Sequence, residues 1–303
     1  MLSDSATGAV YAVAAFGFWG LTPIFYKWLS DVPPLEVLCH RVVWSVVFGA
    51  AYLWLRKDWS RVAETCRRPR LLGVLAITAA LVSVNWLVYI YAVVTDRVMA
   101  TSLGYYINPL VNVLLGMLFL GERLRRGRVL AVVLAVIGTA SLALHLGGLP
   151  WISLTLAFSF GFYGLIRKRL ALPGMPALFV ETALMAPLAV AVLVWFAGNG
   201  QSAFTDDPRQ AALLVLAGPV TLLPLLWFAE AARRLPLNSV GFVQYLAPTL
   251  TFLLAVVVYD EPLTTAWLVT FLFIWAALAV FTADSVRAHR RLRRQLAAGE
   301  ATT

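Results

Sequence analysis

The sequence predicts an all-α membrane protein whose ten transmembrane helices form two inverted five-helix repeats. Three observations lead to this fold class. The chain is 61% hydrophobic and only 13% charged, with a mean hydropathy of +0.82, whereas soluble domains are about 45–50% apolar and about 25% charged. Its apolar stretches are about 20 residues long, which is the length a helix needs to cross a bilayer. A spaced polar motif in the fourth stretch also recurs in the ninth.

The apolar stretches favour helices, because lipid offers no partner for free backbone N–H and C=O groups. In chain order, the expected spans are 7–29, 34–55, 71–94, 99–120, 128–146, 149–166, 176–197, 210–232, 238–259 and 264–283. No loop between them is long enough to hold a second domain. We therefore expect a first repeat over 1–146, a second over 147–284 and a basic cytoplasmic tail over 285–303.

The distribution of basic residues indicates the topology. The net charge is +9, with 24 Lys and Arg residues, most of them in alternate loops and in the tail. The opposite loops hold only Lys27, Arg97 and Arg209, while Arg41 lies inside a span. This bias satisfies the positive-inside rule with both termini in the cytoplasm of a bacterial-type inner (plasma) membrane. The surplus charge is therefore a topology signal rather than a nucleic-acid patch, and no basic segment or cleavage site marks the first span as a signal peptide.

An internal repeat relates the two halves of the chain. The motif residues Tyr106, Pro109, Glu122 and Leu124 correspond to Tyr245, Pro248, Glu261 and Leu263 at one constant offset. The first span of each half also agrees, since GFWGL (17–21) resembles GFYGL (161–165). Because each half has an odd number of spans, the second must enter the membrane upside down. Inverted repeats of this kind are typical of secondary transporters, with a substrate site near the midplane.

Several stretches resemble a known family, the RarD branch of the EamA-type transporters in the drug/metabolite transporter superfamily. They are NWLVYIYAV (85–93), SLGYYINPL (102–110), LGERL (120–124), ARRLPLNSVGFVQYLAPTLTFLLAV (232–256) and DEP (260–262). The resemblance covers nearly the whole chain. It implies ten helices in two inverted repeats around a central cavity that opens alternately to each side. It also implies export of small metabolites or amphipathic drugs, such as amino acids or chloramphenicol-like compounds.

Two prolines fall near the middle of their spans. Pro109 and Pro248 each remove one helical hydrogen bond and clash with the preceding turn, so we predict that both helices bend at the bilayer centre and act as hinges. A static kink that only helps packing is the alternative. Tyr105, Asn108 and Asn112 form one stripe at helical spacing. We expect this stripe to face the cavity, although Asn112 could equally serve an interhelical hydrogen bond.

Aromatic and amide side chains complete the expected cavity wall. Many of the 11 Trp and 10 Tyr residues belong to interfacial belts, but some lie deeper in the spans near repeat-related positions. An aromatic wall suits flat amphipathic ligands and organic cations, while ordinary packing is the alternative for each. The additional cavity candidates are Trp19, Asn85, Trp86, Tyr163, Trp227, Gln244 and Tyr245.

Three ionisable residues within the spans are candidates for charge or proton binding. They are His40 and Arg41 in the second span and Glu181 in the seventh. Ionisable groups inside the membrane are costly and usually functional. Arg41 and Glu181 differ by roughly 12 Å in expected depth, so we expect two separate polar stations rather than an ion pair. Glu36 is a possible local partner of Arg41 or an interfacial residue.

These features favour a secondary transporter with a small-molecule substrate, in contact with the lipid bilayer and with protons as a candidate coupling ion. No metal-binding, nucleophile or P-loop motif is visible, so we expect neither an enzyme nor a cofactor or metal. The alternatives are an intramembrane enzyme and a non-transport membrane subunit. The sequence leaves both a monomer and a homodimer open.

Overall fold

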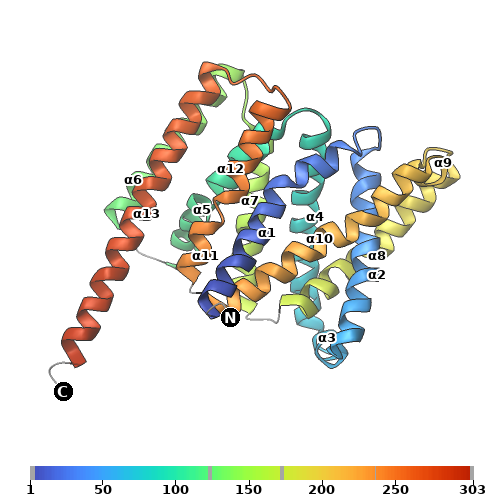
Figure 1. The fold of residues 1–303 in the computed structure, drawn as a ribbon, viewed down its shortest axis with the longest axis horizontal. Helices are drawn as coiled ribbons and strands as arrows, with labels where there is room; N and C mark the ends of the chain where they lie inside the picture. Colours follow the sequence, from blue (N-terminus) through green and yellow to red (C-terminus); the bar gives the residue numbers. More distant parts are fainter. Residues whose placement is uncertain (1–3, 122–124, 171–173, 236, 301–303) are drawn as a thin grey trace. The chain divides into compact units, whose positions relative to one another are not determined.

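The computed structural model describes residues 4–121, 125–170, 174–235 and 237–300, and all regular elements within them are helices. Most of the expected spans correspond to single helices (Figure 1). These are α1 (Asp4–Lys27), α2 (Pro34–Arg56), α4 (Pro69–Val94), α5 (Val98–Leu120), α6 (Arg126–Leu146), α7 (Trp151–Leu170), α8 (Gly174–Gly198), α10 (Pro208–Arg234) and α13 (Thr265–Glu300). The ninth span is divided into α11 (Leu237–Val243), α12 (Leu246–Leu253) and the π-helix η1 (Leu254–Val258). Two short helices, α3 (Trp59–Cys66) and α9 (Ala203–Asp206), lie in connections between spans.

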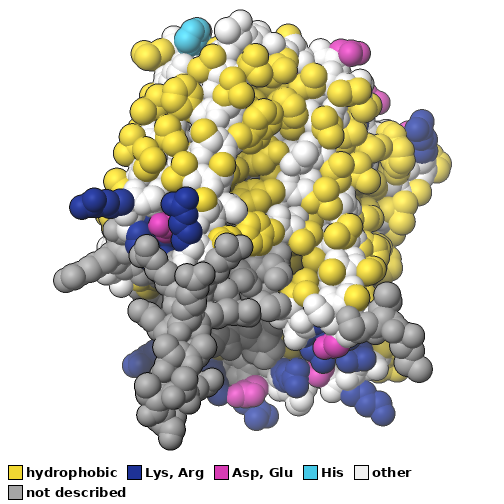
Figure 2. All heavy atoms as spheres, turned by 60° about the vertical axis from the view of Figure 1, so that its left-hand side comes forward, with side chains coloured by type: hydrophobic (Ala, Val, Ile, Leu, Met, Phe, Trp, Pro, Cys, Tyr) yellow, Lys and Arg dark blue, Asp and Glu magenta, His cyan; other side chains and the backbone are white. Residues whose placement is uncertain are grey.

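The helices have the length and the surface of a membrane protein. Within the described residues, nine helical stretches are long and apolar enough to cross a bilayer, and a tenth apolar helix, Trp151–Arg167, is shorter. Large hydrophobic side chains point outward; Leu144 is 83% exposed and Leu188 is 73% exposed. On the face shown in Figure 2, hydrophobic side chains make up most of the described surface. Such extended apolar surface is rare on soluble monomers, so the expected all-α membrane fold class is confirmed.

Proline and aspartate residues define where several helices begin. Pro34, Pro69 and Pro208 each occupy the first turn of a helix, where a missing N–H costs nothing. Asp207 precedes α10, and its carboxylate accepts a 2.8 Å hydrogen bond from the backbone N–H of Arg209. This bond satisfies one of the free donors at the helix start. The starts of these helices are thus encoded locally, which is why the sequence located them to within two residues. The last helix departs from the expectation at its other end, since α13 continues to Glu300 through the expected tail.

Contacts divide the chain into two compact units that mix the two halves of the sequence. The first unit comprises Met1–Ser102 and Ile166–Glu261, and the second comprises Leu103–Leu165 and Pro262–Thr303. In the first unit, α1 packs against α10 and α12, and α2 packs against α8 and α10. In the second, α6 lies along α13 (Figure 1). This is a division by packing, so the repeat boundaries expected at 1–146 and 147–284 stay a prediction.

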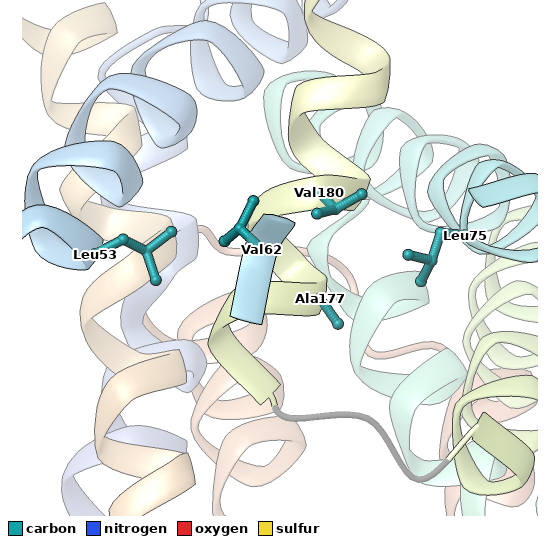
Figure 3. Close-up of a cluster of buried hydrophobic side chains, with 5 residues drawn as sticks. All are labelled: Leu53, Val62, Leu75, Ala177 and Val180. Atoms are coloured by element: carbon teal, nitrogen blue, oxygen red, sulfur yellow. The ribbon is translucent and has the colours of Figure 1, made fainter. Parts of the chain in front are cut away.

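A buried hydrophobic cluster anchors the short helix α3 within the first unit. Its side chains come from α2, α3, α4 and α8 (Figure 3), and they are Leu53, Val62, Leu75, Ala177 and Val180. Leu53 and Leu75 are fully buried, and burial of a Leu side chain contributes roughly 1.5–3 kcal/mol. The cluster joins the C-terminal end of α2 to the N-terminal end of α8, so these two helices run antiparallel.

The backbone differs around the two midplane prolines, Pro109 and Pro248. The ninth span was expected to be one bent helix over 238–259, but it is interrupted at Gln244 and Tyr245, between α11 and α12. The ring of Pro248 excludes a regular turn at the carbonyl of Gln244, which instead accepts a 3.3 Å bond from the N–H of Ala247. The hydroxyl of Ser102 donates a 2.8 Å hydrogen bond to the Pro248 carbonyl. By contrast, α5 runs without interruption through Pro109, so its hinge role stays a prediction.

Glu261, from the repeated motif, stabilises the start of α5. Its carboxylate accepts hydrogen bonds from the backbone N–H groups of Val98 and Met99, the latter at 2.8 Å. These donors have no partner inside their own helix, and a negative charge is favourable at a helix N-terminus. Glu261 therefore has a structural role at a helix start. Its counterpart Glu122 and the motif residue Leu124 lie outside the described residues.

Glycines let the first helix of each half pack closely on a helix of the other half. A Cβ on Gly20, from the GFWGL motif of α1, would lie 2.8 Å from Leu250 Cβ and 2.9 Å from the Ala247 carbonyl oxygen of α12. A Cβ on Gly161, from the GFYGL motif of α7, would lie 2.9 Å from Val111 of α5. The first helix of each half thus packs closely on the proline-containing helix of the other half. This exchange is the packing expected of two symmetry-related repeats.

We predict that Gly20→Ala lowers the thermal stability of the purified protein. The added methyl would enter space that Leu250 and Ala247 occupy, and overpacking costs about 1–3 kcal/mol. Gly73→Ala in α4 is the matched control, because nothing lies within 4 Å of its Cβ position; its melting temperature should stay equal or rise slightly, since Ala is the better helix former. Equal melting temperatures for the two variants would contradict the close α1–α12 contact.

Candidate functional site

Arg41 is a buried cation held by aromatic rings. Its guanidinium carbon lies 4.0 Å from the centroid of the Trp86 ring and 5.8 Å from that of Tyr26. The residue is only 9% exposed, and its Nε atom has no hydrogen-bond partner among the described residues. A desolvated cation–π contact contributes about 2 kcal/mol, which offsets part of the cost of burying the charge. Arg41 is thus stabilised without an ion pair to any described carboxylate.

A second buried polar group lies one turn earlier on α2. The Glu36 carboxylate is fully buried, and its Oε1 accepts a 2.9 Å hydrogen bond from the Ser202 hydroxyl. The same oxygen lies 3.9 Å from Nε2 of His40. The imidazole of His40 stacks on Phe204 of α9, with ring centroids 4.7 Å apart. The sequence placed Glu36 at the interface or beside Arg41, but the structure brings it to His40 instead.

A cavity opens beside this pair of residues. Its volume is about 350 Å³, and it lies between the segment that precedes α2 and the segment that contains α9. Acidic and amide side chains dominate the wall, which is formed by Asp31, Val32, Pro33, Gln201, Ala203, Asp206, Asp207 and Gln210. Ser202 and Phe204, which contact Glu36 and His40, alternate with these wall residues along the chain.

Glu181 lies in a separate cluster near the other end of α2 and α8. The Thr78 hydroxyl donates a 2.6 Å hydrogen bond to its Oε1, and Nη1 of Arg167 lies 3.6 Å from the same oxygen. Arg41 and Glu181 stand equally far from the first residues of their helices, Pro34 and Gly174. Because α2 and α8 are antiparallel, equal spacing places the two charges towards opposite ends. The sequence analysis predicted two separate polar stations because the two residues differ in expected depth.

The asparagine stripe lies in the second unit. The Asn108 side chain is buried, and its Nδ2 donates a 3.0 Å hydrogen bond to the Ala157 carbonyl of α7. Asn112 is exposed, and its Nδ2 donates to Oδ1 of Asn108 at 3.1 Å. The interhelical bond expected of Asn112 is thus made by Asn108. Tyr105 is partly exposed, and its ring packs against Phe160.

The remaining aromatic candidates are partly buried in two groups. In the first unit, Trp19 contacts Phe16 and Phe228 at ring distances of 5.4 and 5.9 Å, and Trp227 contacts Phe18 at 5.8 Å. In the second unit, Tyr163 contacts Phe160 at 5.9 Å.

The amide candidates and the last tyrosine belong to the first unit. Asn85 is 2% exposed on α4, next to Trp86. Gln244 and Tyr245, both half-buried, occupy the break before α12. The candidate residues therefore divide between the two units, and a single cavity that they all line stays a prediction.

Sequence reasoning missed several partners of the buried charges. Thr78 is a single hydroxyl within an apolar stretch, and Ser202 and Phe204 lie in a connection. Arg167 was counted among the topology charges at the end of its span, yet its side chain is 18% exposed and faces Glu181. A buried carboxylate near a cytoplasmic end, combined with a basic run at the same depth, is the signal that could have identified this pair. No group of His, Cys, Asp or Glu suited to a metal ion occurs among the described residues.

Comparisons with known proteins agree on one family. The model of the EamA-like transporter family matches residues 6–144. An "uncharacterized transporter" of Vibrio cholerae is 46% identical over 96% of this chain and 97% of its own length. "Protein RarD" of Escherichia coli is 44% identical over 94% and 96%. The "chloramphenicol-sensitive protein RarD" of Pseudomonas aeruginosa is 30% identical over 96% and 98%.

A solved crystal structure shares the fold. It is 22% identical and covers 94% of this chain and 98% of its own, with a TM-score of 0.60. At this identity the similarity concerns the fold and not the ligand.

We predict that Arg167→Gln destabilises the protein and that the double variant with Glu181→Gln recovers much of the loss. The single change removes a cation that lies 3.6 Å from a buried carboxylate; breaking a buried ion pair typically costs about 3–5 kcal/mol, whereas removal of both charges avoids that penalty. Melting temperatures of the two single variants and the double variant form a double-mutant cycle. Purely additive effects would show that the 3.6 Å contact has no energetic coupling.

Proposed function

The chain belongs to the RarD branch of the EamA-like transporters, and from this membership we propose that it exports small organic metabolites or amphipathic drugs by alternating access. The family and its relatives make the chain a multi-span membrane transporter with a small-molecule substrate. The direction of transport, the class of substrate and the coupling to protons are what we propose, on the basis of contacts within each unit.

The reciprocal packing of the two halves supports alternating access. The GFWGL helix α1 packs on α12, and the GFYGL helix α7 packs on α5. Transporters with inverted repeats move one bundle against the other around a fixed midplane site. Each unit here contains helices from both halves, so both repeats would contribute to each moving bundle.

The surroundings of Arg41 support an amphipathic substrate that is neutral, zwitterionic or anionic. Trp86 and Tyr26 provide flat apolar faces, while the guanidinium carries a positive charge with no carboxylate partner among the described residues. A cationic solute would be repelled there, and a carboxylate would gain a charge-assisted hydrogen bond. Amino acids and chloramphenicol-like compounds both meet this requirement. The name of the Pseudomonas aeruginosa relative refers to chloramphenicol sensitivity, which makes that compound a suitable probe.

Proton coupling completes the proposal, with His40 and Glu181 as the candidates from the sequence. Their surroundings differ. Arg167 lies 3.6 Å from Glu181 and stabilises its carboxylate form. His40 has a buried carboxylate, Glu36, as its neighbour at 3.9 Å. The contacts therefore favour the His40 end of the first unit for proton binding.

We predict saturable counterflow of an amino acid or of chloramphenicol in proteoliposomes, with little uptake of organic cations. Arg41→Gln should reduce uptake of a zwitterionic or anionic substrate about tenfold or more, because a hydrogen bond to a charged group contributes about 1.5–3 kcal/mol. Arg209→Gln is the matched control, since Arg209 is exposed. Uptake no greater than that of empty liposomes for every probe would refute the transport proposal. An Arg41→Gln variant with unchanged uptake would refute the role of Arg41.

We also predict that Cys66 reacts with a membrane-impermeant maleimide only from the cytoplasmic side. Cys66 is exposed in the connection between the second and third spans, whereas Cys39 is buried. From the charge bias we propose that this connection and both termini lie in the cytoplasm. Intact cells should show no labelling and inverted inner-membrane vesicles should be labelled, with Cys66→Ser as the control. Labelling of intact cells would reverse the proposed topology.

A further inference from the structure

The first turn of α2 contains a carboxylate that is buried without full compensation. Glu36 is 0% exposed, its Oε1 accepts one hydrogen bond from Ser202, and its Oε2 has no partner among the described residues. The start of a helix favours a negative charge by only about 0.3–1 kcal/mol at exposed positions and up to about 2 kcal/mol when partly buried. The desolvation penalty of a buried ion is several kcal/mol. The ionised state of Glu36 is therefore only partly stabilised by its surroundings.

The imidazole of His40, next to Glu36, is also buried without hydrogen bonds to the described residues. It is 6% exposed, and neither Nδ1 nor Nε2 has a hydrogen-bond partner among the described residues. Its ring is fixed by the stack on Phe204, at an interplanar angle of 19°. Nε2 faces Glu36 Oε1 at 3.9 Å, beyond hydrogen-bond distance. A carboxylate oxygen and an imidazole nitrogen thus lie close together without a hydrogen bond between them.

The other charged groups near the pair do not neutralise it. On α2 itself, Arg41 lies against Trp86, and Cys39 is the remaining titratable neighbour. On the connection that covers the pair, Asp206 accepts a hydrogen bond from Thr205. The groups that remain on the packed elements are Asp31 before α2, Asp207 and Arg209 at the start of α10, and Glu181 and Arg167 in the separate cluster on α8 and α7.

We propose that Glu36 and His40 form a proton-binding site that takes up one proton from the adjacent 350 Å³ cavity. Without the proton, a carboxylate faces a neutral imidazole and the pair has a charge of −1. A proton that leaves a hydronium ion in the cavity and binds to Nε2 gives an imidazolium–carboxylate pair. A proton that binds to Oε2 gives a carboxylic acid beside a neutral imidazole. In both cases the pair becomes neutral and one O–H or N–H bond is formed.

The wall of the cavity suits proton delivery. Asp31, Asp206 and Asp207 provide carboxylates at its rim, and Gln201 and Gln210 provide amides that can hydrogen-bond water. Negative charge on the wall raises the local concentration of cations, protons included. Ser202 contacts Glu36 and Phe204 contacts His40, while their chain neighbours Gln201 and Ala203 line the cavity. The segment around α9 therefore connects the cavity wall to the pair.

Only the role of the site in proton coupling rests on the proposed function. Proton binding by Glu36 and His40 can be tested independently of transport. The measurement is the number of protons that the purified full-length protein in nanodiscs binds between pH 8 and 5, compared between wild type and Glu36→Gln. We expect the variant to bind about one proton fewer. The control is Glu64→Gln, because the Glu64 side chain is 66% exposed, so this variant removes a carboxyl group from a solvated site.

A second variant, Ser202→Ala, allows the same test if Glu36→Gln does not fold. Ser202→Ala keeps the carboxylate but removes the hydrogen bond that favours its ionised form. We therefore expect the same number of protons to bind, at higher pH than in wild type. An unchanged titration in both variants, or a loss in Glu64→Gln equal to that in Glu36→Gln, would overturn the proton-binding site.

Transport assays then distinguish proton binding at Glu36 and His40 from the proposed proton-coupled transport. If coupling is correct, Glu36→Gln abolishes pH-gradient-driven accumulation of the substrate but keeps counterflow. Accumulation equal to that of wild type would show that this site does not couple protons to transport. Absence of any transport by wild type would refute the proposed function. The number of bound protons would still show whether Glu36 and His40 form a proton-binding site.

Discussion

A polar group inside the hydrocarbon layer must find its partner within the protein, and the described structure follows from how this requirement is met. Backbone groups meet it by forming helices. Side chains meet it by bonding across helices, as Thr78 does with Glu181 and Asn108 does with the Ala157 carbonyl. Such contacts fix the helices relative to one another, because breaking one would leave an unpaired polar group in an environment without water. The interactions that stabilise each unit are therefore also the ones that position its charged groups.

The buried charges meet the requirement to different extents. Glu181 has a hydroxyl donor and a cation nearby, so its carboxylate is well stabilised. Arg41 has aromatic faces but no ion pair among the described residues. Glu36 and His40 leave three polar atoms without partners among the described residues. A transporter needs some groups whose partners come from outside the protein, which is why our proposals for substrate and proton binding both concern α2.

Close packing and helix breaks have complementary roles in the same units. Glycines in α1 and α7 let helices from opposite halves approach closely, which favours rigid contacts. Pro248 interrupts the ninth span, and its own carbonyl accepts a hydrogen bond from the Ser102 hydroxyl. The equivalent residue Pro109 leaves α5 continuous. Two repeats of similar sequence thus differ in their local backbone, since a proline only removes a bond and the neighbouring side chains decide whether the helix yields.

The sequence by itself determined the features that depend on the solvent or on neighbours along the chain. Apolar length set the spans, prolines set helix starts such as Pro34, and the recurring motif revealed the two halves, because lipid and local backbone geometry act on each segment separately. The tertiary structure alone decided the partners. It placed Arg41 against Trp86 and Tyr26 and Arg167, from a run that was read as a topology signal, against Glu181. It also placed Glu36 beside His40, in contact with Ser202 and Phe204 respectively. Such pairings join residues far apart in the chain, and they depend on which helix faces turn toward each other, which no local pattern encodes.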